Sequence, residues 1–324
     1  MNRRSFIKNT GLAGTALGMA GPVTSWLMEN TFLPETRPFF KLSLAQWSLH
    51  KAILENKTLS ALDFAKKARE MGFEAIEYVN ELYKPEINSM GMSKLVTELG
   101  KRSRDNGVKN VLIMVDGEGE LAALSKTERD NAIAGHSKWV DAAAELGCHS
   151  IRVNLFGTGA EQDFNTWKKT SVDGLGRLAE YAQKSKVNVI VENHGGLSSD
   201  AGKLTDVIKT IGLKNCGTLP DFGNFCVKRQ GGERWGAPCI DEYDKYKGVL
   251  ELMPFAHGVS AKTYDFDAKG NETTIDYKRM LKIVKDAGYT GHIGIEYEGN
   301  RLGEEEGIKA TKALLMRIAK ELEN

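Results

Sequence analysis

Three carboxylates in the second half of the chain stand directly after apolar stretches that are typical of buried strands. They are Glu192, Asp221 and Glu296. If these strands run parallel and close into a barrel, their carboxyl ends meet at one mouth, where such folds carry their chemistry. Carboxylates held this close repel one another unless a cation lies between them. The pattern therefore predicts a metal-dependent enzyme in which these three residues hold a divalent ion.

Further polar residues are expected at the same mouth. Residues two apart along a strand face the same side, so His194 accompanies Glu192, and Lys262 accompanies Ser260. We expect Glu192 and Glu296 to transfer protons and Lys262 to stabilise an oxyanion, although Lys262 could also run along its strand to solvent. The candidate substrate-binding residues are His194, Asn224, Arg152, Glu77 and Trp47.

The elements that position these residues repeat along the chain. Short apolar runs alternate with amphipathic stretches, which predicts an α/β fold with a parallel sheet. No glycine-rich dinucleotide fingerprint follows the first run, which disfavours an open, doubly wound sheet. Eight such units would close into a (β/α)8 TIM barrel. The predicted strands are 42–49, 75–79, 110–115, 150–155, 188–192, 217–221, 258–262 and 292–296.

Composition limits the class of protein. The chain has 324 residues and a formal net charge of +1, so it suits one barrel and offers no basic surface for nucleic acid. Its four cysteines have no CxxC spacing, so no zinc ribbon is expected. Cys226 and Cys239 could pair in an oxidising compartment, but four separate thiols is the preferred interpretation.

The N-terminus is typical of an export signal. Arg3 and Arg4, with Phe6 and Lys8, precede an uncharged stretch of small residues, as in twin-arginine signals. This stretch is too short to span a bilayer, so no stable membrane anchor is expected. We predict a signal peptide at 1–21, a linker at 22–40, and a single catalytic domain at 41–324 that acts in the periplasm.

The order of the strand-end acids resembles that of the xylose-isomerase-like barrel superfamily, often labelled sugar phosphate isomerase/epimerase. The group includes D-tagatose 3-epimerase and inosose dehydratase, and the resemblance covers roughly residues 41–322. Its metal set of Glu, Asp, His and Glu falls on Glu192, Asp221, Ser260 and Glu296. The family's seventh strand reads His-x-Lys where this chain has Ser-Ala-Lys, so one imidazole is missing.

A second departure from the family lies after the sixth strand. Asn224 stands where the epimerases carry a histidine, three residues after the aspartate. His194 could supply the nitrogen ligand instead, or water could fill the place. The resemblance implies a divalent metal, and a site rich in carboxylates suits Mn²⁺ or Mg²⁺ better than Zn²⁺, with Co²⁺ also possible.

These features predict a sugar isomerase/epimerase that acts on a keto- or aldo-sugar through a metal-stabilised enediolate. The alternative is a lyase or hydratase that uses the same enolate chemistry on keto-sugars or keto-glycosides. Export favours free or oxidised sugars over phosphorylated ones. A non-catalytic sugar-binding barrel stays open as another class, because the family histidine is missing. A DNA-repair endonuclease would need a histidine-rich site, and the chain has six histidines in all. The oligomeric state stays open.

The export signal can be tested by replacing both Arg3 and Arg4 with lysine. We expect the precursor to stay in the cytoplasm, because the export machinery requires the paired guanidinium groups. Cell fractionation followed by immunoblotting measures the distribution, and Lys8→Arg serves as a control that changes a neighbouring basic residue. A double variant that reaches the periplasm in normal amounts would disprove the assignment.

Overall fold

The computed structural model describes residues 38–157 and 163–323. The predicted export signal and the linker up to residue 37 lie outside the described residues, so they stay predictions. Eight parallel strands form one sheet, in the order β6-β5-β4-β3-β2-β1-β10-β9. These strands are β1 Lys41–Ala45, β2 Ala75–Val79, β3 Lys109–Val115, β4 Ser150–Val153, β5 Asn188–Glu192, β6 Cys216–Leu219, β9 Val259–Thr263 and β10 His292–Tyr297.

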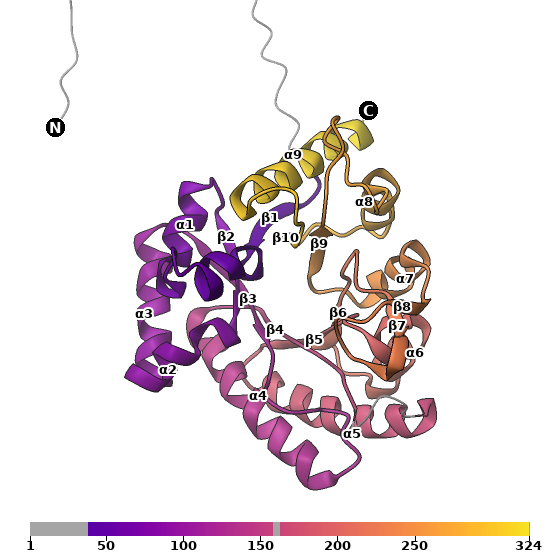
Figure 1. Ribbon diagram of the computed structural model, residues 1–324. Helices are drawn as coiled ribbons and strands as arrows, with labels where there is room; N and C mark the ends of the chain where they lie inside the picture. The colour runs from indigo at the N-terminus through magenta and orange to yellow at the C-terminus, as the bar shows by residue number, and fades with distance from the viewer. Residues whose placement is uncertain (1–37, 158–162, 324) are drawn as a thin grey trace, which may run out of the picture. The chain divides into compact units, whose positions relative to one another are not determined.

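The sheet closes on itself between β6 and β9. Parallel bridges join Thr218 to Ala256 and Asp221 to Ser260. The backbone N–H of Ser260 donates to the carbonyl oxygen of Pro220 at 2.9 Å. The backbone N–H of Phe222 donates to the carbonyl oxygen of Ser260 at 3.2 Å. The strands therefore surround one centre with the helices outside them (Figure 1). The predicted (β/α)8 barrel is confirmed.

The helices cover the outer face of the barrel. Several begin at an Asp or Ser whose side chain accepts a backbone N–H, which stabilises the first turn. No helix among residues 38–157 and 163–323 is long and apolar enough to cross a membrane. The helices are α1 Phe64–Glu70, α2 Lys84–Met90, α3 Met92–Asp105, α4 Lys126–Leu146, α5 Phe164–Gln183, α6 Ala201–Ile211, α7 Lys245–Leu252, α8 Tyr277–Asp286 and α9 Glu304–Glu323.

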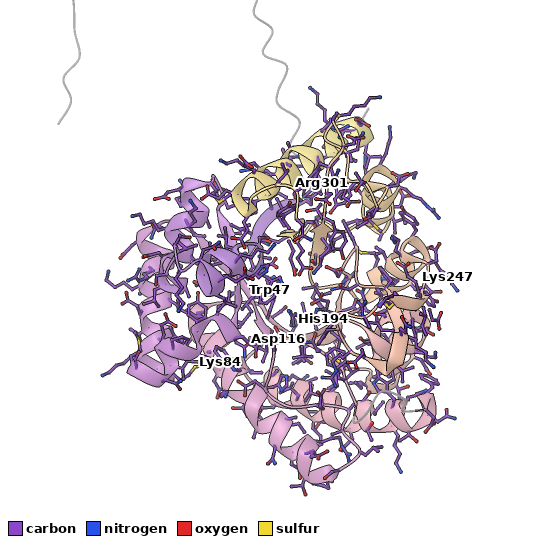
Figure 2. All side chains as sticks on the ribbon, in the orientation of Figure 1. Trp47, Lys84, Asp116, His194, Lys247 and Arg301 are labelled. Atoms are coloured by element: carbon purple, nitrogen blue, oxygen red, sulfur yellow. A yellow bond between two sulfur atoms is a disulfide. The ribbon has the colours of Figure 1, made fainter. Side chains whose placement is uncertain are left out.

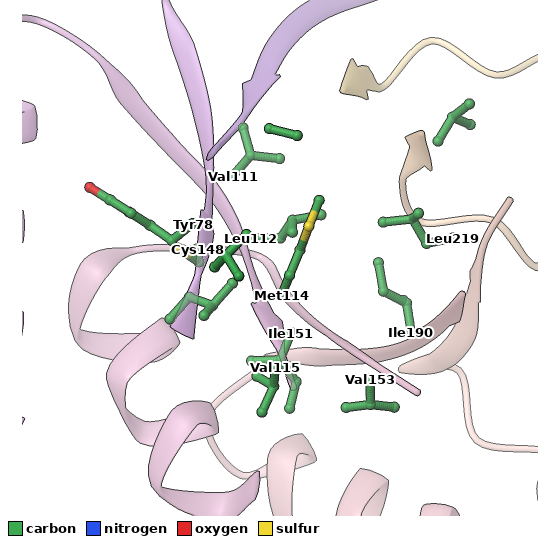
Figure 3. Close-up of a cluster of buried hydrophobic side chains, with 14 of the residues drawn as sticks. Tyr78, Val111, Leu112, Met114, Val115, Cys148, Ile151, Val153, Ile190 and Leu219 are labelled. Carbon is green, nitrogen blue, oxygen red and sulfur yellow. The ribbon is translucent and has the colours of Figure 1, made fainter. Parts of the chain in front are cut away.

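An apolar layer fills the barrel below the mouth. Leu112, Ile190 and Leu219 approach to within 3.3–3.6 Å of the position that a Cβ on Gly258 would occupy. These three side chains are almost fully buried. They belong to the cluster shown in Figure 3, to which β3, β4, β5 and β6 each contribute apolar residues. The layer gives the strand-end residues a rigid floor, because close-packed interiors deform little.

The first strand is shorter than predicted. It ends at Ala45, and Gln46–Leu49 forms a 3-10 helix instead of continuing to residue 49. Two side chains replace the missing ladder bonds. The Oε1 atom of Gln46 accepts the N–H of Val79 at 3.0 Å, and the Oγ atom of Ser48 donates to the carbonyl of Ile295 at 3.1 Å. Polar residues at a strand end can thus compete with the sheet for its backbone partners.

A two-stranded antiparallel hairpin was not predicted. It consists of β7, Cys226–Arg229, and β8, Cys239–Glu242, and it lies in sequence between β6 and α7. A disulfide joins Cys226 to Cys239, so the prediction of four separate thiols is wrong for this pair. The antiparallel fold-back brings the two cysteines together across a separation of 13 residues. Cys148 and Cys216 are buried free thiols.

Two glycines of α5 give a matched test of packing against the barrel. A Cβ on Gly174 would lie 1.9 Å from the carbonyl oxygen of Leu121, whereas one on Gly176 would meet Ile211 at an ordinary 3.8 Å. We expect Gly174→Ala to lower the free energy of unfolding by about 1–3 kcal/mol. Gly176→Ala should raise it by about 0.5–1 kcal/mol, since alanine favours a helix. Urea titration measures both, and equal effects would contradict this account.

Candidate active site

The three strand-end carboxylates lie together at the mouth, as predicted. Glu192 ends β5, Asp221 follows β6, and Glu296 lies near the end of β10. Their exposed fractions are only 1%, 0% and 4%. Figure 2 shows His194, Asp116 and Trp47 around the same central opening. Buried carboxylates must be neutralised or protonated, so their partners decide what the site can do.

Ser260 joins two of these carboxylates. Its Oγ atom lies 2.7 Å from Oδ2 of Asp221 and 3.1 Å from Oε2 of Glu296. A hydroxyl has one proton and can donate to only one carboxylate at a time. Burial, together with the negative charges of Glu192 and Glu296, raises the pKa of Asp221 to about 8. A proton on Asp221 would turn both contacts of Ser260 into hydrogen bonds.

Lys262 is a buried cation among the acids. Its Nζ atom donates to Oε1 of Glu296 at 2.8 Å and to Oε1 of Glu298 at 3.2 Å. Oδ2 of Asp221 lies 3.9 Å away. Burial disfavours the ammonium, but the charges of Glu296, Glu298 and Asp221 outweigh it and hold the pKa of Lys262 well above its usual range. The side chain therefore turns into the mouth, not out to solvent, and carries a full positive charge there.

Glu192 has a different set of partners. The side-chain amide of Asn224 donates to its Oε1 at 2.8 Å. The Nε atom of Arg152 lies 2.9 Å from its Oε2, an ion pair in which the N–H does not point at the oxygen. Burial disfavours the charged form, but His194, Arg152 and Lys262 outweigh it and hold the pKa of Glu192 below its ordinary value.

A chain of polar contacts fixes the imidazole of His194. Oδ1 of Asp116 accepts from Nη1 of Arg152 at 2.7 Å and from Nδ2 of Asn154 at 2.6 Å. Since a carboxylate only accepts, Asn154 must turn its amide oxygen toward Nδ1 of His194, 2.8 Å away. Nδ1 therefore carries the proton, and Nε2 of the neutral ring keeps a lone pair for a ligand. Burial lowers the pKa of His194, which favours this neutral ring.

Glu77 lies deeper in the barrel than the other acids. Its exposed fraction is 2%, and Oε1 accepts the hydroxyl of Ser43 at 2.6 Å. Oε2 is buried without a hydrogen-bond partner among the described residues. Gly294 makes the space, because a Cβ there would lie 2.5 Å from Oε2. Burial, aided by the charge of Glu296, raises the pKa of Glu77 to about 8.

Trp47 lies at the edge of the mouth, within the 3-10 helix after β1. Its ring stacks on His50, with centroids 4.5 Å apart and planes 9° apart. The imidazole of His50 lies 3.7 Å from Glu304 of α9. The indole is only partly buried, so its placement is compatible with the predicted contact to a sugar ring.

No three His, Cys, Asp or Glu side chains surround a common point as metal ligands do, among residues 38–157 and 163–323. Ser260 and the cation of Lys262 lie between Asp221 and Glu296, and Arg152 holds Glu192. The predicted ligands are thus neighbours in one cluster of acidic side chains, and the side chains of Lys262 and Arg152 pair with them. Their role as metal ligands stays a prediction.

Some residues of the mouth were missed by sequence reasoning. Asp116 directly follows β3, so the rule that selected the other strand-end acids could have found it. Phe156 and Trp235 also reach this region, where their rings lie 6.3 and 4.8 Å from that of His194. Trp235 comes from the turn of the unpredicted hairpin. The flanking cysteines are the one local signal in the sequence that could have indicated it.

Residues 65–318 match the sequence model described as Xylose isomerase-like TIM barrel. The chain belongs to this family. The resemblance inferred from the strand-end acids is therefore confirmed, and it places the chain in a superfamily of enzymes.

Two curated relatives match short parts of this xylose isomerase-like barrel. The C-glycoside deglycosidase alpha subunit of Arthrobacter globiformis is 39% identical over 66 residues, which is 19% of this chain and 19% of that protein. The 3'-dehydrocarminate deglycosidase alpha subunit of a Microbacterium species is 40% identical over 48 residues, 15% of this chain and 14% of that protein. The matched stretches span less than a fifth of these relatives.

Solved structures share the fold over most of the chain. The 3-keto-D-glucoside 4-epimerase of E. coli has a TM-score of 0.65 at 15% identity and covers 86% of this chain and 99% of its own. The IOLI protein, with a bound zinc atom, gives 0.62 at 16%, over 87% and 99%. A xylose isomerase-like barrel from Mycobacterium smegmatis, in complex with magnesium, gives 0.60 at 14%, over 89% and 100%. At these identities the likeness shows the fold.

Glu77→Gln tests the buried acid. The folded protein raises the pKa of Glu77 from 4.5 to about 8. It therefore binds this proton more tightly than the unfolded chain does, and the free energy of unfolding falls as pH rises between these values. The loss reaches about 1.4 kcal/mol per pH unit. Glu77→Gln should remove this part of the slope.

The measurement is urea unfolding at a series of pH values from 5 to about 8.5, the window that the shift defines. Glu74→Gln is the matched control, because Glu74 is an exposed carboxylate close by in the sequence. Its slope should equal that of the unaltered chain. An unchanged slope in Glu77→Gln would mean that the carboxyl ionises as easily in the folded protein as in the unfolded one.

Proposed function

We propose that the chain is a sugar isomerase/epimerase that removes and returns the proton on a carbon next to a carbonyl group. The observation that carries the proposal is the separate partnering of Glu192 and Glu296. They lie on β5 and β10, which β6 and β9 separate in the closed barrel. Each has its own cation, Arg152 for Glu192 and Lys262 for Glu296. A sugar bound between them would meet an acid–base group on two sides.

The two carboxyls also differ in protonation. The pKa of Glu192 is held below its ordinary value, whereas burial and the charge of Glu192 raise that of Glu296. Glu192 is thus suited to accept the proton from carbon as a base, and Glu296 to return one as an acid. A return from the opposite side inverts the stereocentre, and a return to the neighbouring carbon moves the carbonyl.

Other residues of the mouth have supporting tasks in this proposal. The ammonium of Lys262 would stabilise the negative oxygen that develops when the carbon loses its proton. Arg152 and Asn224 hold the carboxylate of Glu192 in place through their contacts of 2.9 and 2.8 Å. His194 would accept a sugar hydroxyl at Nε2, and Trp47 would contact the ring.

A divalent cation, Mn²⁺, Mg²⁺ or Co²⁺, is part of the proposal. Glu192, Asp221 and Glu296 would hold it. Their chemistry fits, because carboxylate oxygens are the ligands that these ions prefer and the three acids lie in one polar cluster. When bound, the ion would stabilise negative charge on a substrate oxygen. The zinc-bound and magnesium-bound neighbours of the same fold support this part.

The alternative is a lyase or hydratase acting on a keto-sugar or keto-glycoside. It needs the same proton abstraction by Glu192, followed by loss of a group from the next carbon. The short matches to two deglycosidase subunits favour this alternative. The similarity in fold to a 3-keto-D-glucoside 4-epimerase favours the isomerase/epimerase. Both reactions require a carbonyl group on the sugar. We further propose that the reaction takes place in the periplasm, after twin-arginine export.

The experiment measures deuterium exchange from solvent into a panel of keto-sugars, by NMR and mass spectrometry, with added Mn²⁺, Mg²⁺ or Co²⁺. Exchange into recovered sugar or its epimer is expected. Glu192→Gln should slow it by about 10²-fold or more, the scale of losing a general base. Lys262→Met should slow it by about 10²-fold, the scale of losing one electrostatic stabiliser. Glu74→Gln, on the surface, should leave the rate unchanged.

The same samples separate the competing proposals. An unsaturated or deglycosylated product in place of exchanged sugar would establish the lyase alternative. Metal analysis of Asp221→Asn and Glu296→Gln should show lower occupancy, with circular dichroism confirming that the barrel stays folded. Absence of exchange and product from every keto-sugar, in a folded and metal-supplied protein, would refute the enzyme and favour a sugar-binding barrel.

A further inference from the structure

The disulfide-closed hairpin, residues 226–242, carries an aromatic side chain to the edge of the mouth. Its strand β7 packs against the 3-10 helix Gly196–Ser199, which follows β5. The segment between these strands holds Arg234 and Trp235. Trp235 is 48% exposed, although tryptophan is usually much more buried in a folded protein. Half of a large apolar surface is therefore free to receive a ligand.

The exposed indole belongs to a three-ring wall. Its ring centroid lies 4.8 Å from that of His194 and 5.7 Å from that of Phe156. The guanidinium of Arg234 lies over Phe156, 4.3 Å from the ring centroid, and its Nη1 atom is 2.7 Å from Glu120. Three separate segments, the loops after β4 and β5 and the hairpin, thus converge on one wall. Its inner end is the His194 imidazole of the proposed sugar site.

A cavity of about 490 Å³ borders this wall. Phe156 and Arg234 line it together with Leu197, Val227 and Arg229. None of the strand-end carboxylates is among the residues that line it. The cavity is therefore a second space, next to the proposed reaction site and separate from it. Its size lies in the range of small-molecule pockets.

The chemistry of the walls suits a ring with an apolar face and a polar rim. Phe156, Leu197 and Val227 offer apolar surface, while Arg229 and Arg234 offer hydrogen-bond donors at the edge. Aromatic side chains provide a flat surface for such a ring. A single sugar ring at the carboxylates would leave this cavity and the exposed face of Trp235 unused.

We propose that the cavity is a second subsite, which binds the ring attached to the reacting sugar. The substrate would then be a glycoside: a sugar at the carboxylates with a second ring in the cavity, against Phe156 and Leu197. The attached ring is either a second sugar or an aromatic group, since both present a flat face of this kind. This inference rests on the proposed function for the position of the reacting sugar, and it narrows the substrate from sugars in general to glycosides.

The test is direct binding of unreactive ligands, measured by calorimetry and by tryptophan fluorescence of the whole protein. Methyl β-D-glucoside, cellobiose and phenyl β-D-glucoside share one sugar and differ in the attached group. We expect cellobiose, phenyl β-D-glucoside or both to bind at least about 10-fold more tightly than the methyl glycoside. Phe156→Ala should abolish the advantage, because Phe156 lines the cavity, and Phe156→Leu should keep part of it.

Ile240→Ala is the matched control, because Ile240 is an exposed apolar residue of β8 in the same hairpin and does not line the cavity. It should bind all three ligands as the unaltered chain does. An advantage for cellobiose alone identifies a second sugar, and one for the phenyl glycoside alone identifies an aromatic group. Equal affinities, no binding of any ligand, or an advantage that survives Phe156→Ala would overturn the subsite.

Binding of these ligands requires no turnover, so the two proposals fail separately. Absence of deuterium exchange with a retained advantage for the larger glycosides would refute the reaction and leave the subsite standing. Exchange into keto-sugars with equal affinities for the three glycosides would refute the subsite and leave the reaction standing.

Discussion

Charge balance at the mouth of the barrel is the constraint on which the rest of the site depends. Glu192, Asp221 and Glu296 are buried within one polar cluster, and the nearby buried cations are Lys262 and Arg152. Burying ions is costly unless each is paired and hydrogen-bonded. The acids differ in protonation as a result: the pKa of Glu192 is lowered, which favours its ionised form, and the pKa of Asp221 is raised, which favours its protonated form. The same imbalance that makes the site costly gives it groups able to move protons.

Room for this cluster is made by residues that lack side chains. A Cβ on Gly223 would lie 2.9 Å from Cγ of Lys262 and 2.6 Å from the hydroxyl of Tyr264, and one on Gly294 would meet Glu77. These glycines allow a lysine and a glutamic acid where the barrel would otherwise pack aliphatic groups. The apolar layer below then keeps the strand ends from moving apart. Polar placement and apolar packing are thus parts of one arrangement along the same strands.

Much of this arrangement could be predicted from the sequence, because strand ends are a local property. The eight apolar runs located the barrel strands, and the acids after them located the mouth. The failures have a shared physical cause. Gln46 and Ser48 end β1 early by bonding to neighbouring strands, and the hairpin depends on Cys226 meeting Cys239. Such tertiary partners leave no periodic trace along the chain. Which cation holds each carboxylate also depends on distances that spacing does not encode.

The disulfide of the hairpin bears on where and when the protein completes its folding. Such bonds form in oxidising compartments and are rare where thiols are kept reduced. A chain that folds in the cytoplasm and is exported already folded would complete its barrel first and its hairpin cross-link later. The hairpin that holds Trp235 beside His194 would then receive its disulfide only after export. Under the proposed export, a single pair of cysteines would divide maturation into two stages, one set by packing and one by redox chemistry.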